Sequence, residues 1–321
     1  MSDIVYIGAP EASWADFRPR AVADFPDADL GGSDDRLAAR SLLADARGII
    51  AHHFQFDETL LAAAPRLAWI QSLTTGTDAI LRLRNLRPEV RVTSTRGMHG
   101  PQMSELVFLH MLALLRDFPR MLRNQAARRW ERWPQPLLWR KTAVIVGVGA
   151  ISEALAPRCK AFGMTVYGVS NSSRVPEGFD RIFPRSEITR AAALADFLIL
   201  VVPYSTETEN LVDEQVIGAL PPHGYLINVA RGGVLDEQAL LRALREHRIA
   251  GAALDVFRDQ PLPPEHPLWR EDRVLISPLL GGMSNVYLEQ AYPIVRQNLG
   301  HFLAGRPEQM INRVTRGNST R

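Results

Sequence analysis

The stretch TAVIVGVGAIS, residues 142–152, decides the fold class of this chain. Its small and β-branched residues predict a buried strand that runs directly into Gly147 and Gly149. Gly147 permits a tight turn, and Gly149 lets the backbone approach a pyrophosphate at the N-terminus of the following helix. Ser152 replaces the third glycine of the dinucleotide fingerprint and is still small enough to pack close to a sheet. The stretch therefore predicts a dinucleotide-binding strand–turn–helix unit.

Short apolar runs alternate with helical spacing on both sides of this unit. Buried strands are expected at 4–8, 48–54, 67–73, 90–93, 164–169, 197–202, 225–228, 251–254 and 274–277. Helices are expected at 36–46, 57–64, 104–116, 236–246 and 285–303, with an aromatic- and proline-rich connector at 128–140. Such alternation predicts parallel sheets covered by helices, and 321 residues fit two domains better than one.

Composition and charge give no support to a nucleic-acid-binding or membrane-binding protein. A hydrophobic content of 46% with 22% charged residues is ordinary globular usage, and a net charge of +2 provides no footprint for nucleic acid or a membrane surface. Cys159 is the only cysteine, which excludes an intrachain disulfide and disfavours a thiolate metal site. The N-terminus has no basic region of a signal peptide, and the longest apolar stretch, 197–202, is too short to span a membrane. We expect a soluble, cytoplasmic protein.

The loop after the second strand of the dinucleotide unit indicates which dinucleotide the protein binds. About 20 residues after the glycines, an NAD site places a carboxylate on the ribose 2′-hydroxyl. This chain has Ser170, Asn171, Ser172 and Arg174 in that region. These side chains donate hydrogen bonds that suit a 2′-phosphate, and an arginine can do so bidentately. The sequence therefore predicts NADP(H) in preference to NAD(H).

Ordered motifs along the chain carry a family resemblance. They are GVGAIS at 147–152, VPYSTETENLV at 202–212, INVARGGVLDEQAL at 227–240, ALDVF at 253–257, PLPPEHPLW at 261–269 and SPLLGGMS at 277–284, preceded by QSLTTGTDAI at 71–80 and RGMHGPQMSE at 96–105. The chain resembles the D-isomer-specific 2-hydroxyacid dehydrogenases, and in particular their NADPH-dependent glyoxylate/hydroxypyruvate reductase branch.

This resemblance implies an α/β fold of two Rossmann-like or flavodoxin-like, doubly wound parallel-sheet domains with a cleft between them. The discontinuous substrate domain would comprise 1–98 and 286–321, and the dinucleotide-binding domain would comprise 99–285. Closure of the cleft would exclude water from the substrate. The resemblance also implies a homodimer formed through the cofactor domain and a small carboxylate substrate.

Family chemistry moves a hydride between the nicotinamide and C2 of a 2-keto acid. By resemblance, Arg231 would be catalytic and would bind the substrate carboxylate and carbonyl, which suits the forked guanidinium. The amides of Thr75 and Gly76 would bind the carboxylate as well. The cofactor would be lined by the glycine loop, the 170–174 loop and several strand-end residues: Gly147, Gly149, Ala150, Ile151, Val202, Pro203, Thr208, Val229, Ala230, Asp255 and Gly281.

Two positions depart from the family pattern. Gln260 stands where the family has a glutamate that holds the catalytic histidine, and Leu279 stands where the family has that histidine. Leucine cannot transfer a proton, and loss of a positioned general acid typically costs about 10²–10⁴ in rate. The two changes agree with each other, because a glutamate that orients a histidine has no task once the histidine is gone.

Another group would then have to supply the proton. His99, at the start of the predicted 104–116 helix region, and His53, after a strand end, are the leading candidates. The others are His52, Tyr204 and Tyr287.

Three functions remain open from the sequence. The first is NADPH-dependent reduction of a 2-keto acid or related carbonyl with a non-standard proton donor. The second is hydride transfer without a proton relay, and the third is a catalytically silent NADP(H)-binding protein. The retained glycine loop and Arg231 favour an enzyme, because a silent binder needs no carboxylate clamp.

Overall fold

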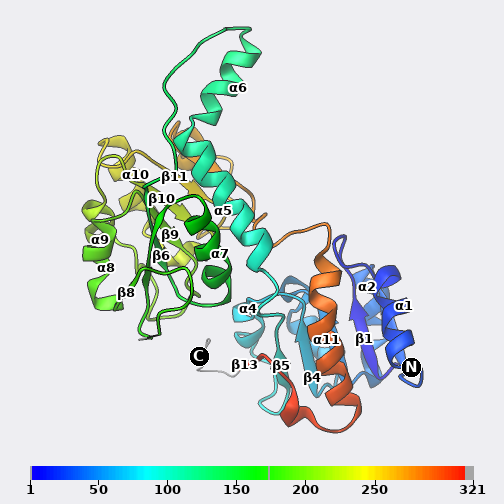
Figure 1. The fold of residues 1–321 in the computed structure, drawn as a ribbon. Coiled ribbons are helices and arrows are strands. Elements are labelled where there is room, and N and C mark those ends of the chain that lie inside the picture. The colour runs from blue at the N-terminus through cyan, green and yellow to red at the C-terminus, as the bar shows by residue number, and fades with distance from the viewer. Residues whose placement is uncertain (1, 173, 315–321) are drawn as a thin grey trace. The chain divides into compact units, whose positions relative to one another are not determined.

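The computed structural model describes residues 2–172 and 174–314 (Figure 1). The chain divides into two compact units. Unit 1 comprises Met1–Met98 and Met283–Arg321, and unit 2 comprises His99–Gly282. No helix among the described residues is long and apolar enough to cross a membrane.

Unit 2 contains a seven-stranded sheet in the order β12-β11-β10-β9-β6-β7-β8, and every strand pair in it is parallel. Its strands are β6 (Thr142–Val146), β7 (Thr165–Val169), β8 (Arg181–Phe183), β9 (Phe197–Leu200), β10 (Tyr225–Asn228), β11 (Gly251–Leu254) and β12 (Val274–Ile276). The chain proceeds outward from β6 to β8, returns to β9 beside β6, and then proceeds outward in the other direction. Ligands of such doubly wound sheets bind at the carboxyl ends of the strands, near this reversal.

Helices cover both faces of this sheet, and the strand residues alternate between them. Val144 and Val146 of β6 face a core shared with α8 (Ile188–Ala192), α9 (Glu214–Ala219) and α10 (Glu237–Arg245). Ala143 and Ile145 face the opposite core, shared with α5 (Gly100–Leu115) and α7 (Ala150–Ala161). Figure 1 shows the strands between these two groups of helices. Burial on both faces explains why these strands are continuous apolar runs.

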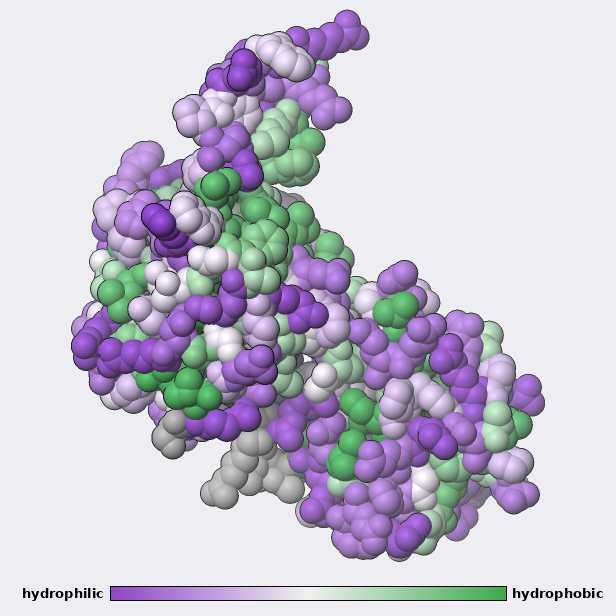
Figure 2. All heavy atoms as spheres, viewed as in Figure 1, coloured by the Kyte–Doolittle hydropathy of each residue, from purple (hydrophilic) through white to green (hydrophobic). Residues whose placement is uncertain are grey.

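One segment of unit 2 stands away from its sheet. After α5, the chain forms α6 (Phe118–Ala126), and the following connector returns to β6 without helix or strand (Figure 1). We call residues 118–139 the arm. Trp130 is 93% exposed and Trp139 56%, and hydrophobic side chains continue from α5 onto the arm (Figure 2).

Unit 1 contains a six-stranded sheet in the order β13-β5-β4-β3-β1-β2, parallel except for β13. Its strands are β1 (Ile4–Ile7), β2 (Leu30–Ser33), β3 (Gly48–Ala51), β4 (Trp69–Ser72), β5 (Arg91–Thr93) and β13 (Arg313–Val314). One face packs on α1 (Trp14–Asp24) and α11 (Tyr287–Leu303), and the other on α2 (Arg36–Arg40) and α3 (Glu58–Ala62). The short α4 (Asp78–Leu81) follows the loop after β4.

The predicted fold class, two parallel-sheet α/β domains, is confirmed. The prediction missed β2, β8 and β13, which are short edge strands without a continuous apolar run. The expected helix at 36–46 is wrong in its length, because α2 ends at Arg40 and a single 3₁₀ turn follows at Leu43–Asp45. The helix expected at 104–116 begins earlier, at Gly100, with Pro101 in its first turn, a position where proline is well tolerated.

Candidate functional site

The predicted cofactor residues of unit 2 gather at the carboxyl edge of its sheet. Each group lies within five residues of a strand end: Gly147 after β6, Ser170 after β7, Val202 after β9, Val229 and Ala230 after β10, Asp255 after β11 and Gly281 after β12. Because the strands are parallel, residues from six separate segments meet along one edge of the sheet.

The glycine turn has the geometry that its sequence predicts. Gly147 has a φ of 105°, and a Cβ there would lie 2.8 Å from the backbone N of Val202. A Cβ on Gly149 would meet nothing within 4 Å, so the space beside the start of α7 is open. Ser152 is fully buried, and its Oγ accepts a hydrogen bond from the Gly149 amide at 2.8 Å. The open space beside Gly149 at a helix N-terminus suits the pyrophosphate of a dinucleotide.

The loop after β7 holds the predicted 2′-phosphate residues. The Ser172 amide donates to Ser170 Oγ, and the Arg174 amide donates to Ser172 Oγ. The Arg174 guanidinium forms an ion pair with Glu153 in the first turn of α7. Sequence reasoning found no carboxylate near this loop, because Glu153 lies 21 positions away and reaches Arg174 only in the folded unit. Ser173 lies outside the described residues.

The loop after β9 is closed by Thr208. The Thr208 hydroxyl is buried, accepts from the Ser205 amide at 2.7 Å and donates to the Pro203 carbonyl at 2.9 Å. Both hydrogen bonds of the Thr208 hydroxyl are therefore made to other residues of the same loop. Thr208 therefore fixes the backbone of the segment that begins at Val202, which packs against Gly147.

Arg231 lies in a tightly fixed turn, which we call the β10 turn (residues 228–233). Asn228, the last residue of β10, accepts a hydrogen bond from the Ala230 amide at 3.0 Å and donates one to the Arg231 carbonyl at 3.1 Å. The Arg231 guanidinium is partly buried and donates to the Ala230 carbonyl at 2.7 Å. Asn228 belongs to the motif at 227–240, but the sequence did not predict that its side chain holds the turn.

The two glycines after Arg231 permit close packing. A Cβ on Gly232 would lie 2.0 Å from the backbone carbon of Phe257, so no side chain fits there. A Cβ on Gly233 would lie 2.5 Å from the ring of Tyr204. Tyr204 therefore packs on the β10 turn within unit 2.

His99 is in the same unit and feels the charge of Arg231. Its side chain is 7% exposed at the N-cap position of α5. Burial, and next the Arg231 cation, lower the pKa of His99 to about 4. A Cβ on Gly282 would lie 3.6 Å from His99 Cδ2, so the imidazole also borders the loop after β12. The structure thus brings together two predicted catalytic residues that are 132 positions apart in the sequence (231 − 99).

The loop after β12, which we call the β12 loop (residues 277–282), contains Leu279, where the sequence predicts a departure from the family pattern. Leu279 has a φ of 57° and is 49% exposed, so its side chain does not belong to the core. Gln260 is exposed as well. The loop backbone is nevertheless held, because the amides of Leu280 and Gly281 donate to the buried Asp255 carboxylate at 2.8 and 2.9 Å.

The predicted substrate loop lies in unit 1, after β4. Thr74 Oγ1 donates to the Gly76 carbonyl at 3.0 Å and lies 3.0 Å from His53 Nδ1. Ser72 Oγ accepts from the Thr74 amide at 3.2 Å. Thr74 therefore shapes the loop that carries Thr75 and Gly76.

The remaining proton-donor candidates also lie in unit 1. His52 follows β3 and is 2% exposed, and its Nε2 lies 3.3 Å from Glu11 Oε1. The Tyr287 hydroxyl is buried and donates to the Leu73 carbonyl at 2.5 Å. Among the five candidates, His99 and Tyr204 belong to the unit that holds Arg231.

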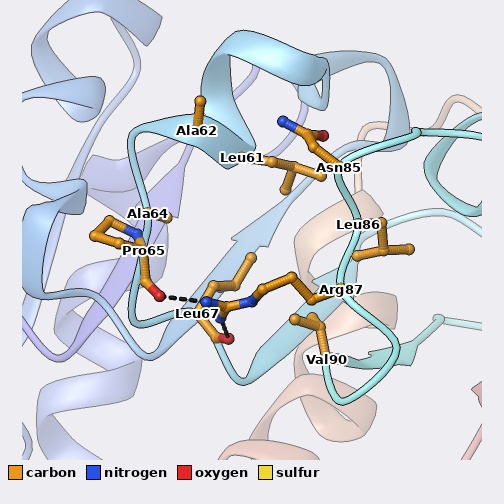
Figure 3. A pocket seen from close by; sticks show the side chains of 9 residues that line it. All are labelled: Leu61, Ala62, Ala64, Pro65, Leu67, Asn85, Leu86, Arg87 and Val90. Carbon is orange, nitrogen blue, oxygen red and sulfur yellow. Dashed lines mark hydrogen bonds between the residues drawn. The ribbon is translucent and has the colours of Figure 1, made fainter.

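A cavity of about 260 Å³ in unit 1 does not coincide with these residues (Figure 3). Its lining includes Leu67, just before β4, and Val90, just before β5, so it lies at the amino edge of the sheet. The Arg87 guanidinium, which lines this cavity, donates hydrogen bonds to the carbonyls of Pro65 and Leu67. Within the described residues, no group of three His, Cys, Asp or Glu side chains is arranged to hold a metal ion.

Known proteins resemble this chain in sequence. A family model for the D-isomer specific 2-hydroxyacid dehydrogenase, NAD binding domain, matches residues 108–281, all of them in unit 2. A glyoxylate reductase from Thermococcus litoralis is 32% identical over 271 residues, which cover 80% of each chain. A 2-ketogluconate reductase from Gluconobacter oxydans is 36% identical over 208 residues, 63% of this chain and 65% of that protein.

Solved structures agree over nearly the whole chain. A D-isomer specific 2-hydroxyacid dehydrogenase family protein from Aeromonas salmonicida has a TM-score of 0.89 and 31% identity, covering 98% of this chain and 99% of that one. A D-isomer specific 2-hydroxyacid dehydrogenase from Xanthobacter autotrophicus, in complex with NADPH and MES, has a TM-score of 0.81 and 27% identity, covering 98% of each chain. The protein belongs to the D-isomer-specific 2-hydroxyacid dehydrogenase family.

Proposed function

We propose that this protein is an NADPH-dependent reductase of a 2-keto acid in which His99 replaces the family histidine as proton donor. The observation that carries the proposal is that the buried His99 borders the loop after β12 and lies in the electrostatic field of Arg231 within one unit. A cation and an imidazole beside a dinucleotide turn are the groups that carbonyl reduction requires.

Arg231 binds and polarises the substrate in this proposal. Its guanidinium is held by the fixed β10 turn, so little ordering is needed when a carboxylate arrives. The forked N–H donors match a carboxylate, and the cation stabilises negative charge that develops on the carbonyl oxygen. The expected carboxylate ligands Thr75 and Gly76 belong to unit 1 and remain part of the proposal.

His99 holds the proton for that carbonyl oxygen. In the free protein, burial and the Arg231 cation keep the imidazole neutral at neutral pH, with a pKa of about 4. An anionic substrate offsets the charge of Arg231 and thereby favours protonation of His99. Binding of the carboxylate and loading of the proton are therefore coupled.

The cofactor supplies the hydride, and the chain supplies its binding residues. The turn at Gly147–Gly149 and the first turn of α7 suit the pyrophosphate, and Asp255 and Gly281 lie farther along the same edge. We propose NADP(H) in preference to NAD(H) because Ser170, Ser172 and Arg174 offer hydrogen-bond donors. The NADPH complex of the Xanthobacter relative supports this assignment.

Two variants with opposite expected effects test the cofactor assignment. Arg174→Ala should weaken NADPH binding about tenfold and leave NADH binding unchanged, because one charge-assisted contact is lost. Glu153→Ala should strengthen NADPH binding, because it removes a carboxylate that competes for Arg174. Fluorescence titration measures both affinities, and equal affinity of the wild type for NADPH and NADH contradicts the assignment.

A panel assay tests the reaction. The pure protein is mixed with NADPH and glyoxylate, hydroxypyruvate, phenylpyruvate or other 2-keto acids, and loss of NADPH absorbance is followed. Turnover that falls at least about 10²-fold in Arg231→Ala supports the proposal. Arg190→Ala is the matched control, because Arg190 is an exposed arginine of unit 2 paired with Glu187. NADPH binding without turnover on any acid favours the silent NADP(H)-binding protein.

The arm supports a further part of the proposal, a homodimer formed through the cofactor domain. Trp130 is almost fully exposed, and Leu122 and Leu137 are about half exposed. All three belong to the arm, which stands away from its own sheet (Figure 2). Contiguous exposed hydrophobic side chains of this kind mark interaction surfaces. Size-exclusion chromatography with light scattering should give a dimer, and Trp130→Glu should shift it toward the monomer. A monomeric wild type contradicts this part.

A further inference from the structure

A chain of hydrogen bonds connects α5 to the β12 loop. His110 Nε2 lies 3.2 Å from Ser277 Oγ, which donates to Asp255 Oδ1 at 2.6 Å. The Asp255 carboxylate also accepts the Leu280 and Gly281 amides, at 2.8 and 2.9 Å. His110, Ser277 and Asp255 are 4%, 8% and 2% exposed, so the chain is closed to water. The proposed reaction uses neither His110 nor Ser277.

The hydroxyl of Ser277 fixes the direction of this chain. A serine has one hydroxyl proton, and at 2.6 Å from a carboxylate oxygen that proton goes to Asp255. His110 must therefore donate its Nε2–H to Ser277, which leaves Nδ1 unprotonated. His110 Nδ1 is buried and has no hydrogen-bond partner among residues 2–172 and 174–314. Burial lowers the pKa of His110 to about 4, which agrees with a neutral ring.

We propose that His110 is a positioning residue for the reacting site. Its Nε2–H holds Ser277, Ser277 orients the Asp255 carboxylate, and Asp255 fixes the backbone of Leu280 and Gly281. The inference rests on the proposed function, because it assigns His110 to the edge where NADPH and substrate are expected. Gly282 ends the same loop and borders His99, so the chain of bonds also sets one wall of the proton donor's surroundings.

A double-mutant cycle tests this role through the dissociation constant of NADPH, measured by fluorescence titration. His110→Leu and Ser277→Ala should each raise it about tenfold. Ser277→Ala removes a hydrogen bond to the Asp255 carboxylate, and His110→Leu removes the donor that holds Ser277 in place. The double variant should bind no more weakly than the weaker single variant, because both changes break one chain. His110→Gln retains an N–H donor and should stay within about threefold of wild type. Met111→Leu changes a neighbouring buried residue of α5 and should leave binding unchanged.

Two results would overturn the inference. One is an effect of His110→Leu no larger than that of Met111→Leu. The other is a double variant in which the single effects multiply to about a hundredfold, which indicates independent sites. If His110→Leu does not fold, His110→Met takes its place in the cycle with the same outcomes, because methionine is adaptable in a buried site and donates no hydrogen bond.

Nitrogen NMR of labelled histidine tests the direction of this chain of hydrogen bonds, while the binding cycle tests its effect on the site. The proposal predicts a neutral His110 with the proton on Nε2 between about pH 5 and 8. A proton on Nδ1, or a cationic ring in that range, contradicts it. Neither this spectrum nor the binding cycle requires turnover. A wild type that binds NADPH but reduces no keto acid therefore contradicts the proposed function and leaves the test of His110 intact.

Discussion

The β10 turn and the β12 loop occupy the same edge of one sheet, and they differ in what holds them. Hydrogen bonds from Asn228 and the lack of space around Gly232 fix the β10 turn, which leaves its sequence little freedom. In the β12 loop, Asp255 holds the backbone, while the Leu279 side chain is half exposed and unconstrained by packing.

This difference shows how a reaction site can keep its framework and change a chemical group. Backbone positions that are fixed by buried partners tolerate few residues, whereas a half-exposed side chain can change without loss of stability. This agrees with our sequence interpretation, in which Arg231 matches the family pattern and Leu279 departs from it. The proton donor can then come from another element, and His99 at the start of α5 is the group that the unit 2 edge provides.

The largest expected effect concerns His99. His99→Gln should lower keto-acid reduction by about 10²–10⁴-fold, because a positioned general acid is lost. In the wild type, kcat/KM should keep rising as the pH falls from about 8 toward the free-enzyme pKa of about 4, since only the protonated ring donates. Steady-state rates across this range check the slope, with the exposed His223→Gln as control. A plateau that begins near the ordinary histidine pKa of about 6.5 contradicts the assignment.

A rescue experiment sharpens the comparison of the two loops. Leu279→His with Gln260→Glu restores the family pair, and histidine tolerates the left-handed backbone at 279 better than leucine does. In the His99→Gln background, this pair should recover at least about tenfold of the lost rate, a part of what a positioned acid contributes. In the wild-type background the gain should be smaller, because His99 already supplies the proton. Equal gains in both backgrounds would show that His99 is not the donor.

Alanine at two glycines tests how firmly each loop is packed. Gly232→Ala should lower the free energy of unfolding by about 3 kcal/mol, because its Cβ would overlap the Phe257 backbone. Gly282→Ala should change it by less than about 1 kcal/mol, because its Cβ would make ordinary contacts with His99. Urea denaturation measures both, and similar costs at the two positions would refute the contrast.

The stability should also depend on pH. His99 and His110 each have a folded-state pKa of about 4, below the unfolded value near 6.5. The unfolded chain binds more protons between these values, so the free energy of unfolding falls as the pH drops from about 6.5 toward 4. Each ring contributes at most on the order of 3 kcal/mol to this loss. His110→Gln should flatten the curve measured by urea denaturation, and an unchanged slope would contradict the burial of a neutral ring.

Local signals in the sequence predicted much of the fold and part of the site. Gly147 and the strand before it predict a turn whose φ and close approach to Val202 the structure confirms. The edge strand β2 was missed because Gly31 and Gly32 lack the apolar pattern of a strand, although they pair with β1. Pattern reasoning fails there because partners across the sheet, and not the residues themselves, fix the conformation.

The sequence did not predict the contacts between segments that are far apart along the chain. The Glu153–Arg174 ion pair places a carboxylate beside the predicted cofactor loop. The contact between His110 and Ser277 joins residues that are 167 positions apart. Neither pair leaves a periodic trace along the chain, because the strand order of the sheet decides which loops meet.

The sequence by itself determined the alternation of strands and helices and the glycine turn, and it predicted a role for the arginine of the β10 turn and an altered pattern at positions 260 and 279. Only the tertiary structure decided that His99 lies in the field of Arg231 and that His110 connects through Ser277 to Asp255. The physical reason is that backbone conformation and amphipathic patterning act over a few residues. Burial, electrostatic fields and hydrogen-bond chains instead depend on which elements the sheet places side by side.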